Sequence, residues 1–166
     1  MNYIQIDKTS ISNGLGVRVV LWCAGCSIHC DECQNPQTWD FNSGKPFDDK
    51  VKAYLFEQLS KPYIQGITFS GGNPLDHPYQ IFLLTKEIKE KFPNKDIWLY
   101  SGYTYEQIYQ SHEKLKALCY IDVLVDGPYI KELRDITLPF RGSTNQRLIN
   151  VPKTLIQGKI ITIQND

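Results

Sequence analysis

Four of the five cysteines in this chain lie between Cys23 and Cys33, and this cluster constrains the fold more than any other feature. The remaining cysteine, Cys119, stands alone far downstream. A secreted disulfide framework usually shows an even number of cysteines spread along the chain, which this pattern does not match. Closely spaced thiolates instead suit zinc or an iron–sulfur cluster. The cluster therefore predicts a metal centre on one loop of a protein that folds in a reducing compartment.

The cysteine spacing alone leaves open two metal sites, and also a loop without metal. In the first site, all four cysteines bind a structural zinc ion, although such sites usually set their two ligand pairs further apart. In the second, Cys26, Cys30 and Cys33 hold three irons of a 4Fe–4S cluster and Cys23 is not a ligand. Residues 17–23 favour the second site because they are typical of a buried strand, which would place Cys23 in the core. Three thiolates leave one iron open to a substrate or cofactor.

Length and composition describe an ordinary globular chain. The 166 residues fit one domain covering positions 1–166. Because 18 Lys and Arg balance 18 Asp and Glu, the net charge of zero gives no support for binding nucleic acid or an acidic membrane. No apolar run approaches the roughly 18 residues that span a bilayer, and the first residues do not resemble a secretory signal. We therefore expect a cytoplasmic protein.

Strand-like and helix-like segments alternate along the chain. We expect a loop at 39–46, strands at 17–23, 66–70, 96–101 and 121–126, and helices starting at 47–49, over 76–91, and over 105–118 with a break near Ser111. Such alternation predicts an α/β fold with a mostly parallel sheet and helices outside it. Four or five units cannot complete an eight-stranded barrel, so we expect a partial (βα) barrel that is open on one side.

Candidate site residues follow the carboxyl ends of these expected strands. Cys26 follows the first strand, Gly71 the second, Gly102 the third and Gly127 the fourth. Ligands of parallel α/β sheets bind at that edge, so we expect these segments to converge. Gly71 and Gly72 either form a plain strand-to-helix turn or expose backbone N–H and C=O groups to a small ligand.

The spacing Cys26-x3-Cys30-x2-Cys33 resembles the signature of radical S-adenosylmethionine enzymes. Residues 13–18 (Asn-Gly-Leu-Gly-Val-Arg) are similar to the N-G-x-G-x-R opening of enzymes that install glycyl radicals, and residues 70–75 are similar to the Gly-Gly motif of the superfamily. Further segments follow in the expected order at 95–103, 122–127 and 141–147. With its short length, the chain resembles the activating enzymes of anaerobic ribonucleotide reductases up to about residue 150. The last sixteen residues lie outside this resemblance.

The resemblance implies a fold, a reaction and partners. It implies the radical S-adenosylmethionine fold, a 4Fe–4S cluster on Cys26, Cys30 and Cys33, and S-adenosylmethionine bound at the open iron. Reductive cleavage of that cofactor would supply a radical that takes the α-hydrogen from a glycine of the large reductase subunit. A reducing partner such as flavodoxin would supply the electron.

The resemblance also places six residues beside S-adenosylmethionine: Glu32, Cys33, Gln34, Gly71, Gly72 and Asn73. Three of them depart from the usual pattern, because Glu32 replaces an aromatic residue or glycine, Gln34 an aromatic residue and Asn73 an acid. A side chain at Gly72 is expected to block the cofactor and to leave the cluster in place.

Other residues have ordinary structural interpretations, and none is assigned a catalytic role. His29 has no visible partner, Cys119 is expected to be a buried thiol, and Arg141 and Arg147 contact either a carboxylate, a partner or solvent. Three other functions remain possible from the sequence: an activator of a different glycyl-radical enzyme, a deazapurine synthase, and a non-catalytic zinc or iron–sulfur module.

Overall fold

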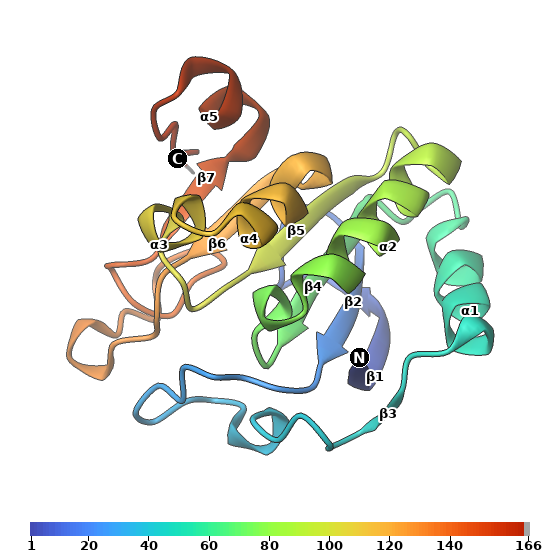
Figure 1. Ribbon diagram of the computed structural model, residues 1–166, viewed down its shortest axis with the longest axis horizontal. Coiled ribbons are helices and arrows are strands. Elements are labelled where there is room, and N and C mark those ends of the chain that lie inside the picture. The colour runs from blue at the N-terminus through green and yellow to red at the C-terminus, as the bar shows by residue number, and fades with distance from the viewer. Residues whose placement is uncertain (165–166) are drawn as a thin grey trace.

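A seven-stranded mixed sheet forms the centre of the computed structural model, which describes residues 1–164 (Figure 1). Its strands are β1 (Asn2–Ser10), β2 (Arg18–Cys23), β3 (Lys45–Pro46), β4 (Gly66–Gly71), β5 (Asp96–Tyr100), β6 (Val123–Asp126) and β7 (Arg147–Asn150). The helices are α1 (Asp49–Leu59), α2 (Pro78–Lys91), α3 (Tyr105–Tyr109), α4 (His112–Ala117) and α5 (Val151–Gln157). Within residues 1–164, no helix combines the length and the apolar character needed to cross a bilayer.

The expected parallel sheet is confirmed at the centre and extended at both edges. Strand order is β3-β1-β2-β4-β5-β6-β7, and β2, β4, β5 and β6 run parallel to one another. The outer strands β1, β3 and β7 are antiparallel to their neighbours, and none of the three was expected from the sequence. Residues 45–46, expected in a loop, form β3. The sheet is open, with β3 and β7 as its last strands.

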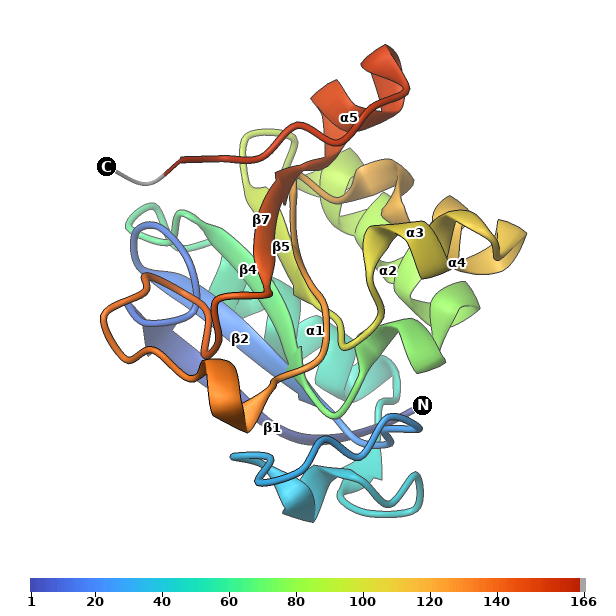
Figure 2. The ribbon, with the colours of Figure 1, turned by 90° about the vertical axis from the view of Figure 1, so that its left-hand side faces the viewer.

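Side chains of the central strands alternate between two faces of the sheet, as the strand period of two requires. The face toward the helices carries the main core, in which Leu21, Phe69 and Leu99 are fully buried. Figure 2 shows α2, α3 and α4 on this side of the sheet and irregular loops on the other. The loop side carries Trp22 and Tyr100, and Tyr100 packs there against a smaller apolar cluster of Trp98, Val123, Val125 and Leu148. Cys23 is fully buried in the main core, as expected.

Helices α1 and α3 begin where the sequence predicts, whereas α2 begins at Pro78, two residues later than expected, and α5 was not expected. The Asp48 side chain caps α1 by accepting a hydrogen bond from the Val51 N–H at 2.9 Å. The inner face of α2 consists of four buried residues, as its spacing predicts: Ile81, Leu84, Thr85 and Ile88. The break near Ser111 is also confirmed, because Ser111 ends the turn after α3 and caps α4.

The expectation of a buried Cys119 is wrong. Cys119 is exposed, and it lies in a 3₁₀ turn spanning Leu118–Tyr120. Successive side chains of such a turn point in different directions around its axis, so only one of the three faces the core. Leu118 takes that place and is fully buried.

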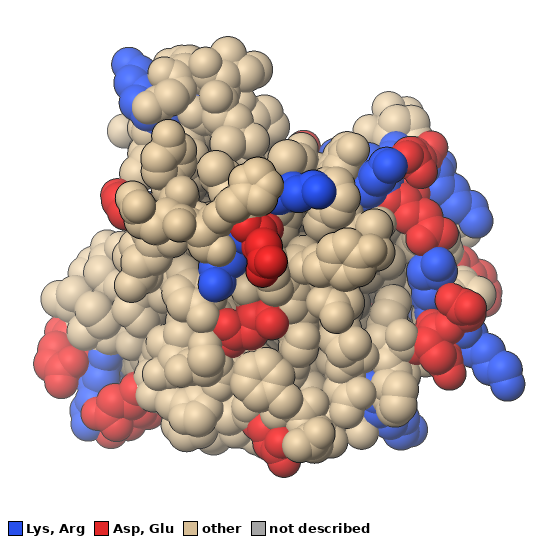
Figure 3. All heavy atoms as spheres, viewed as in Figure 1, with Lys and Arg blue, Asp and Glu red and all other residues tan. Residues whose placement is uncertain are grey.

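Charges are mixed over the face drawn in Figure 3. Lys and Arg are interspersed with Asp and Glu there, and no broad patch of one sign covers it. This distribution agrees with the zero net charge and gives no footprint for nucleic acid on that face.

Candidate active site

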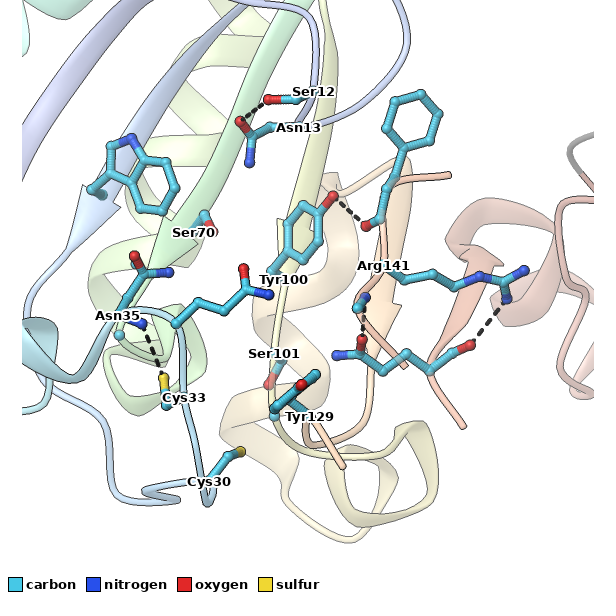
Figure 4. A pocket seen from close by; sticks show the side chains of 18 of the residues that line it. Ser12, Asn13, Cys30, Cys33, Asn35, Ser70, Tyr100, Ser101, Tyr129 and Arg141 are labelled. Atoms are coloured by element: carbon cyan, nitrogen blue, oxygen red, sulfur yellow. Dashed lines mark hydrogen bonds between the residues drawn. The ribbon is translucent and has the colours of Figure 1, made fainter. Parts of the chain in front are cut away.

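A cavity of about 730 Å³ lies over the loop side of the sheet and reaches the carboxyl ends of the parallel strands (Figure 4). The four segments expected to converge all line it, through Cys26, Gly71, Gly102 and Gly127. Cys30 and Cys33 lie at one end of the cavity, while Ser12 and Asn13 lie at the other. Its volume is within the range of roughly 300–1,000 Å³ that small-molecule sites occupy.

The cysteine loop follows β2 and is held by its backbone to the end of a 3₁₀ turn at Pro36–Thr38. The N–H groups of Gly25 and Cys26 donate to the carbonyls of Thr38 and Trp39 at 2.7 and 3.0 Å. The loop turns again where the Cys33 N–H donates to the Cys30 carbonyl at 3.1 Å. Cys26 is almost buried, whereas Cys30 and Cys33 are half-buried and open to the cavity. Burial raises the pKa of the Cys30 thiol.

The other two cysteines lie outside this group. Burial raises the pKa of the Cys23 thiol to about 12, because the core gives a thiolate no compensating partner. Cys119 is on the far side of the chain in the turn before β6 and does not line the cavity. The structure therefore brings only three of the five cysteines to the cavity.

A zinc site would need a tighter arrangement of ligands. Zinc binds thiolates at about 2.3 Å in a tetrahedron, so the sulfurs around one ion lie within about 4 Å of one another. Among residues 1–164, no three His, Cys, Asp or Glu side chains converge closely enough to hold a single metal ion. In an iron–sulfur cluster, by contrast, each thiolate is bound to a different iron, and the sulfurs stand further apart.

The Gly71-Gly72 turn touches the cysteine loop directly. The Gly72 N–H donates to the Cys23 carbonyl at 2.9 Å, and the Asn73 N–H donates to the Gly25 carbonyl at 2.8 Å. These donors are therefore already engaged and are not free for a ligand, contrary to one sequence-based interpretation. The Gly72 carbonyl accepts no hydrogen bond within residues 1–164 and lies on the cavity wall. It is an available acceptor for an ammonium group.

Gly72 also lacks room for a side chain. A Cβ atom at this position would lie 2.3 Å from the Gly25 carbonyl oxygen, which is part of the backbone and cannot turn away. This close approach argues against the expectation that a side chain at Gly72 would leave the cysteine loop undisturbed. Such a side chain would push against the cysteine loop before it met any ligand.

Of the remaining predicted cofactor residues, some line the cavity and others do not. Cys33 and Gln34 line the cavity, but Glu32 and Asn73 do not. Glu32 is exposed and forms an ion pair with Lys131, which links the cysteine loop to the segment after β6. Asn73 is fully buried, and its Oδ1 accepts from the Ser101 hydroxyl at 2.9 Å, while its Nδ2 finds no partner among residues 1–164.

Asp76 and His77 hold the cysteine loop through hydrogen bonds that the residue pattern did not indicate. The Asp76 carboxylate accepts from the Ser27 N–H at 2.8 Å, from the Ser27 hydroxyl at 3.0 Å and from the Tyr103 hydroxyl at 2.7 Å. The His77 ring lies 2.8 Å from the Ala24 carbonyl through Nε2. Asp76 and His77 had been interpreted only as the start of a helix. The signal for their role is their position directly after the Gly-Gly turn.

The segment between β6 and β7 closes another side of the cavity. The Tyr100 hydroxyl donates to the Phe140 carbonyl at 2.6 Å, and Arg141 Nη1 donates to the Gln146 carbonyl at 3.0 Å (Figure 4). Arg147 instead binds two carboxylates of this chain, those of Asp126 and Glu106. The Arg147 hydrogen bonds lower the pKa of Glu106 to about 2. Of the two arginines, only Arg141 lines the cavity.

His29 has a structural contact. Its ring stacks on Trp39 with centroids 4.4 Å apart and planes within 10° of parallel. The stack packs the middle of the cysteine loop against the segment that follows it.

We expect Asp76→Ala to loosen the cysteine loop, because the Ser27 N–H and the Tyr103 hydroxyl lose their acceptor. The loss of stability should be about 1–3 kcal/mol. The cluster should be stripped faster by an iron chelator, which the decay of its visible absorbance measures. Asp48→Ala is the matched control, since losing that helix cap costs a similar about 0.5–2 kcal/mol far from the loop. Equal stripping rates in the two variants would contradict the anchoring role of Asp76.

Known proteins resemble this chain over most of its length. A family model described as a 4Fe-4S single cluster domain matches residues 12–149, which include the cysteine loop and the Gly-Gly turn. An anaerobic ribonucleoside-triphosphate reductase-activating protein of Enterobacteria phage T4 is 44% identical, with 89% of this chain and 93% of the relative covered. Proteins of that name from Pasteurella multocida and Escherichia coli are 40% and 38% identical, with 88% of this chain and 95% and 96% of each relative covered.

The chain belongs to the family of anaerobic ribonucleoside-triphosphate reductase-activating proteins. The resemblance found in the motifs is thereby confirmed. The 4Fe–4S cluster is confirmed as the metal centre of this activating-protein family, in preference to zinc or a loop without metal. Three of the five cysteines of the chain line the cavity at the carboxyl ends of the parallel strands.

Proposed function

We propose that this protein activates an anaerobic ribonucleoside-triphosphate reductase by generating a glycyl radical on its large subunit. One observation carries the proposal: three cysteines with radical-enzyme spacing and a Gly-Gly turn line one cavity, in a chain 38–44% identical to activating proteins. The activity makes the chain an oxidoreductase that works without oxygen.

Cys26, Cys30 and Cys33 are proposed as the cluster ligands. Support comes from their shared place at one end of the cavity and from the location of the other two cysteines, one in the core and one in a distant turn. Three ligands leave one iron for S-adenosylmethionine. The free carbonyl of Gly72 is suited to the ammonium group of that cofactor, and the cavity volume of about 730 Å³ is suited to its size.

The six predicted cofactor residues are then proposed to act in two ways. Cys33, Gln34, Gly71 and Gly72 contact S-adenosylmethionine from the cavity wall. Glu32 and Asn73 act indirectly: Glu32 holds the cysteine loop through Lys131, and Asn73 supports the Gly-Gly turn through Ser101. Two of the three departures from the usual pattern of the superfamily, Glu32 and Asn73, therefore fall on positions that do not line the cavity, whereas the third, Gln34, lines it.

When bound, the cluster and S-adenosylmethionine supply a 5′-deoxyadenosyl radical that can take the α-hydrogen of a glycine. The chain orients these groups and keeps water away from them. Trp22, Tyr100 and Phe140 form an aromatic wall of the cavity, and the hydrogen bond from Tyr100 to Phe140 fixes the wall to the loop. We propose that the open sheet curves around this space as the partial barrel of the radical S-adenosylmethionine fold.

Several features outside the site belong to the same proposal. The substrate is the large reductase subunit, and a small reductant such as flavodoxin delivers the electron. Residues 1–166 act as a single domain, because every proposed site residue lies at the end of β4 or in the loops that follow β2 and β4 of one sheet. The cytoplasm, with its reducing conditions, is the proposed location.

The proposal is tested by the products of the reaction. Under strictly anaerobic conditions, the cluster-loaded protein, a strong reductant, S-adenosylmethionine and the cognate reductase should yield methionine and 5′-deoxyadenosine in proportion to the radical on the reductase. Chromatography of the small molecules and spin counting give the two amounts. Cleavage of S-adenosylmethionine with turnover of a small molecule and no radical on the reductase would instead identify a small-molecule radical enzyme.

A further inference from the structure

One edge of the sheet lacks a neighbouring strand over most of its length. β1 pairs with β2 from Tyr3 to Ser10, but with β3 only at Asn2 and Tyr3. Residues 4–9 make no backbone hydrogen bond to any segment other than β2 within residues 1–164. Figure 2 shows β1 along the rim of the sheet. Unpaired backbone groups in such an edge are a template for another strand.

The opposite edge of the sheet, at β7, is paired with another segment of the chain. The outer side of β7 is covered by the chain itself, because the Asn150 N–H donates to the Ile161 carbonyl at 2.8 Å and the Ile163 N–H donates to the Leu148 carbonyl at 2.7 Å. The fold therefore closes one edge with its own C-terminal segment and leaves the β1 edge open.

The open edge is continuous with the proposed active cavity. Asp7, Thr9 and Ser10 of β1 line the cavity, and so does Asn13 in the loop that follows. The Asp7 carboxylate accepts from Trp22 Nε1 at 2.8 Å, which fixes this part of β1 to the cavity wall. A segment that paired with β1 would therefore run along the mouth of the cavity.

We propose that residues 4–10 of β1 bind an extended segment of the reductase, which adds to the sheet as a further strand and brings the neighbouring glycine to the cavity. The inference rests on the proposed function, since it takes the reductase as the polypeptide that must reach this cavity. Glycine has no side chain, so an enzyme that selects one must recognise the polypeptide around it, and the main chain beside the glycine is one part of that polypeptide. Strand addition does this, because main-chain hydrogen bonds supply the affinity.

Lys8 offers a test of the backbone contact. It is exposed, does not line the cavity, and lies between Asp7 and Ser10 where the pairing with β2 is irregular. Proline removes a backbone donor and is incompatible with a strand added at that position. With the cluster-loaded protein, Lys8→Pro should weaken binding of the reductase about tenfold, as expected for the loss of one or two main-chain hydrogen bonds. Lys8→Ala keeps the backbone N–H and should bind like the wild type.

Hydrogen exchange on the wild-type protein gives an independent result. Adding the reductase should slow the exchange of amides in residues 4–10, whereas amides of the already covered β7 should change little. Unchanged exchange in residues 4–10, or equal weakening by Lys8→Pro and Lys8→Ala, would overturn the proposal even if the reductase radical forms normally. The proposal would also be overturned if Lys8→Pro lost self-association but bound the reductase normally. The β1 edge would then join two copies of this chain. Absence of any reductase radical with the wild type would count against the proposed function instead.

Discussion

Cys30→Ala is expected to abolish the visible absorbance of the reconstituted 4Fe–4S cluster and, with it, all radical formation on the reductase. Cys30 is one of three cysteines at the cavity, and neither of the other two cysteines of the chain lines it. Two protein ligands cannot hold a cluster that already leaves one iron open. Cys26→Ala and Cys33→Ala should behave in the same way. Iron and sulfide analysis of each anaerobically reconstituted variant measures the result.

Cys23→Ala and Cys119→Ala are the matched controls for the ligand variants. Cys23→Ala removes one buried sulfur and should cost about 1 kcal/mol of stability while the cluster is retained. Cys119→Ala changes an exposed side chain and should have almost no effect. Loss of the cluster in folded Cys23→Ala would contradict the assignment of three ligands and revive a site with four.

Gly72→Val should also cause a large loss of the cluster, although its side chain would press on the backbone of the cysteine loop rather than replace a ligand. Its Cβ would lie 2.3 Å from the Gly25 carbonyl oxygen and 3.0 Å from the Thr38 carbonyl oxygen. Relieving these contacts requires the cysteine loop to move, at a cost of about 1–3 kcal/mol or more. We expect lower thermal stability together with poor cluster retention, measured by calorimetry and iron content.

Gly158→Ala serves as the control for Gly72→Val. Its Cβ would meet nothing within 4 Å, although its φ of +67° makes alanine mildly strained. It should lower stability by about 1 kcal/mol and leave the iron content unchanged. If Gly72→Val retained a full cluster and failed only to bind S-adenosylmethionine, the close packing of the turn against the loop would be contradicted.

The central strands and the main helices could be predicted because their sequences carry one consistent pattern. The β-branched run before Cys23 has a buried strand as its simplest explanation, and the apolar spacing of α2 matched all four of its buried residues. β1 escaped prediction because its side chains are mixed and only partly buried, so no clear alternation appears. It is ordered mainly by pairing with β2, a long-range contact that local sequence does not encode.

The sequence predicted the types of ligand in the candidate site but not the hydrogen bonds that hold them in place. Cysteine spacing and the Gly-Gly pair identified the two segments that meet at the cavity. The engagement of the Gly72 N–H, the hydrogen bonds of Asp76 and the closing contact of Tyr100 with Phe140 join residues far apart in the chain. Such contacts depend on how the strands are placed relative to one another, which the residue pattern of each segment does not state.

Electron paramagnetic resonance of the activated reductase tests the central claim most directly. After anaerobic incubation with this protein, a strong reductant and S-adenosylmethionine, the reductase should show a doublet from a carbon-centred radical split by the remaining α-hydrogen. The signal should stay with the reductase when the two proteins are separated, and it should collapse towards a singlet when the reductase carries α-deuterated glycine. A signal that remains on this chain, or a doublet that deuterated glycine leaves unchanged, would contradict the activation of a glycine on the reductase.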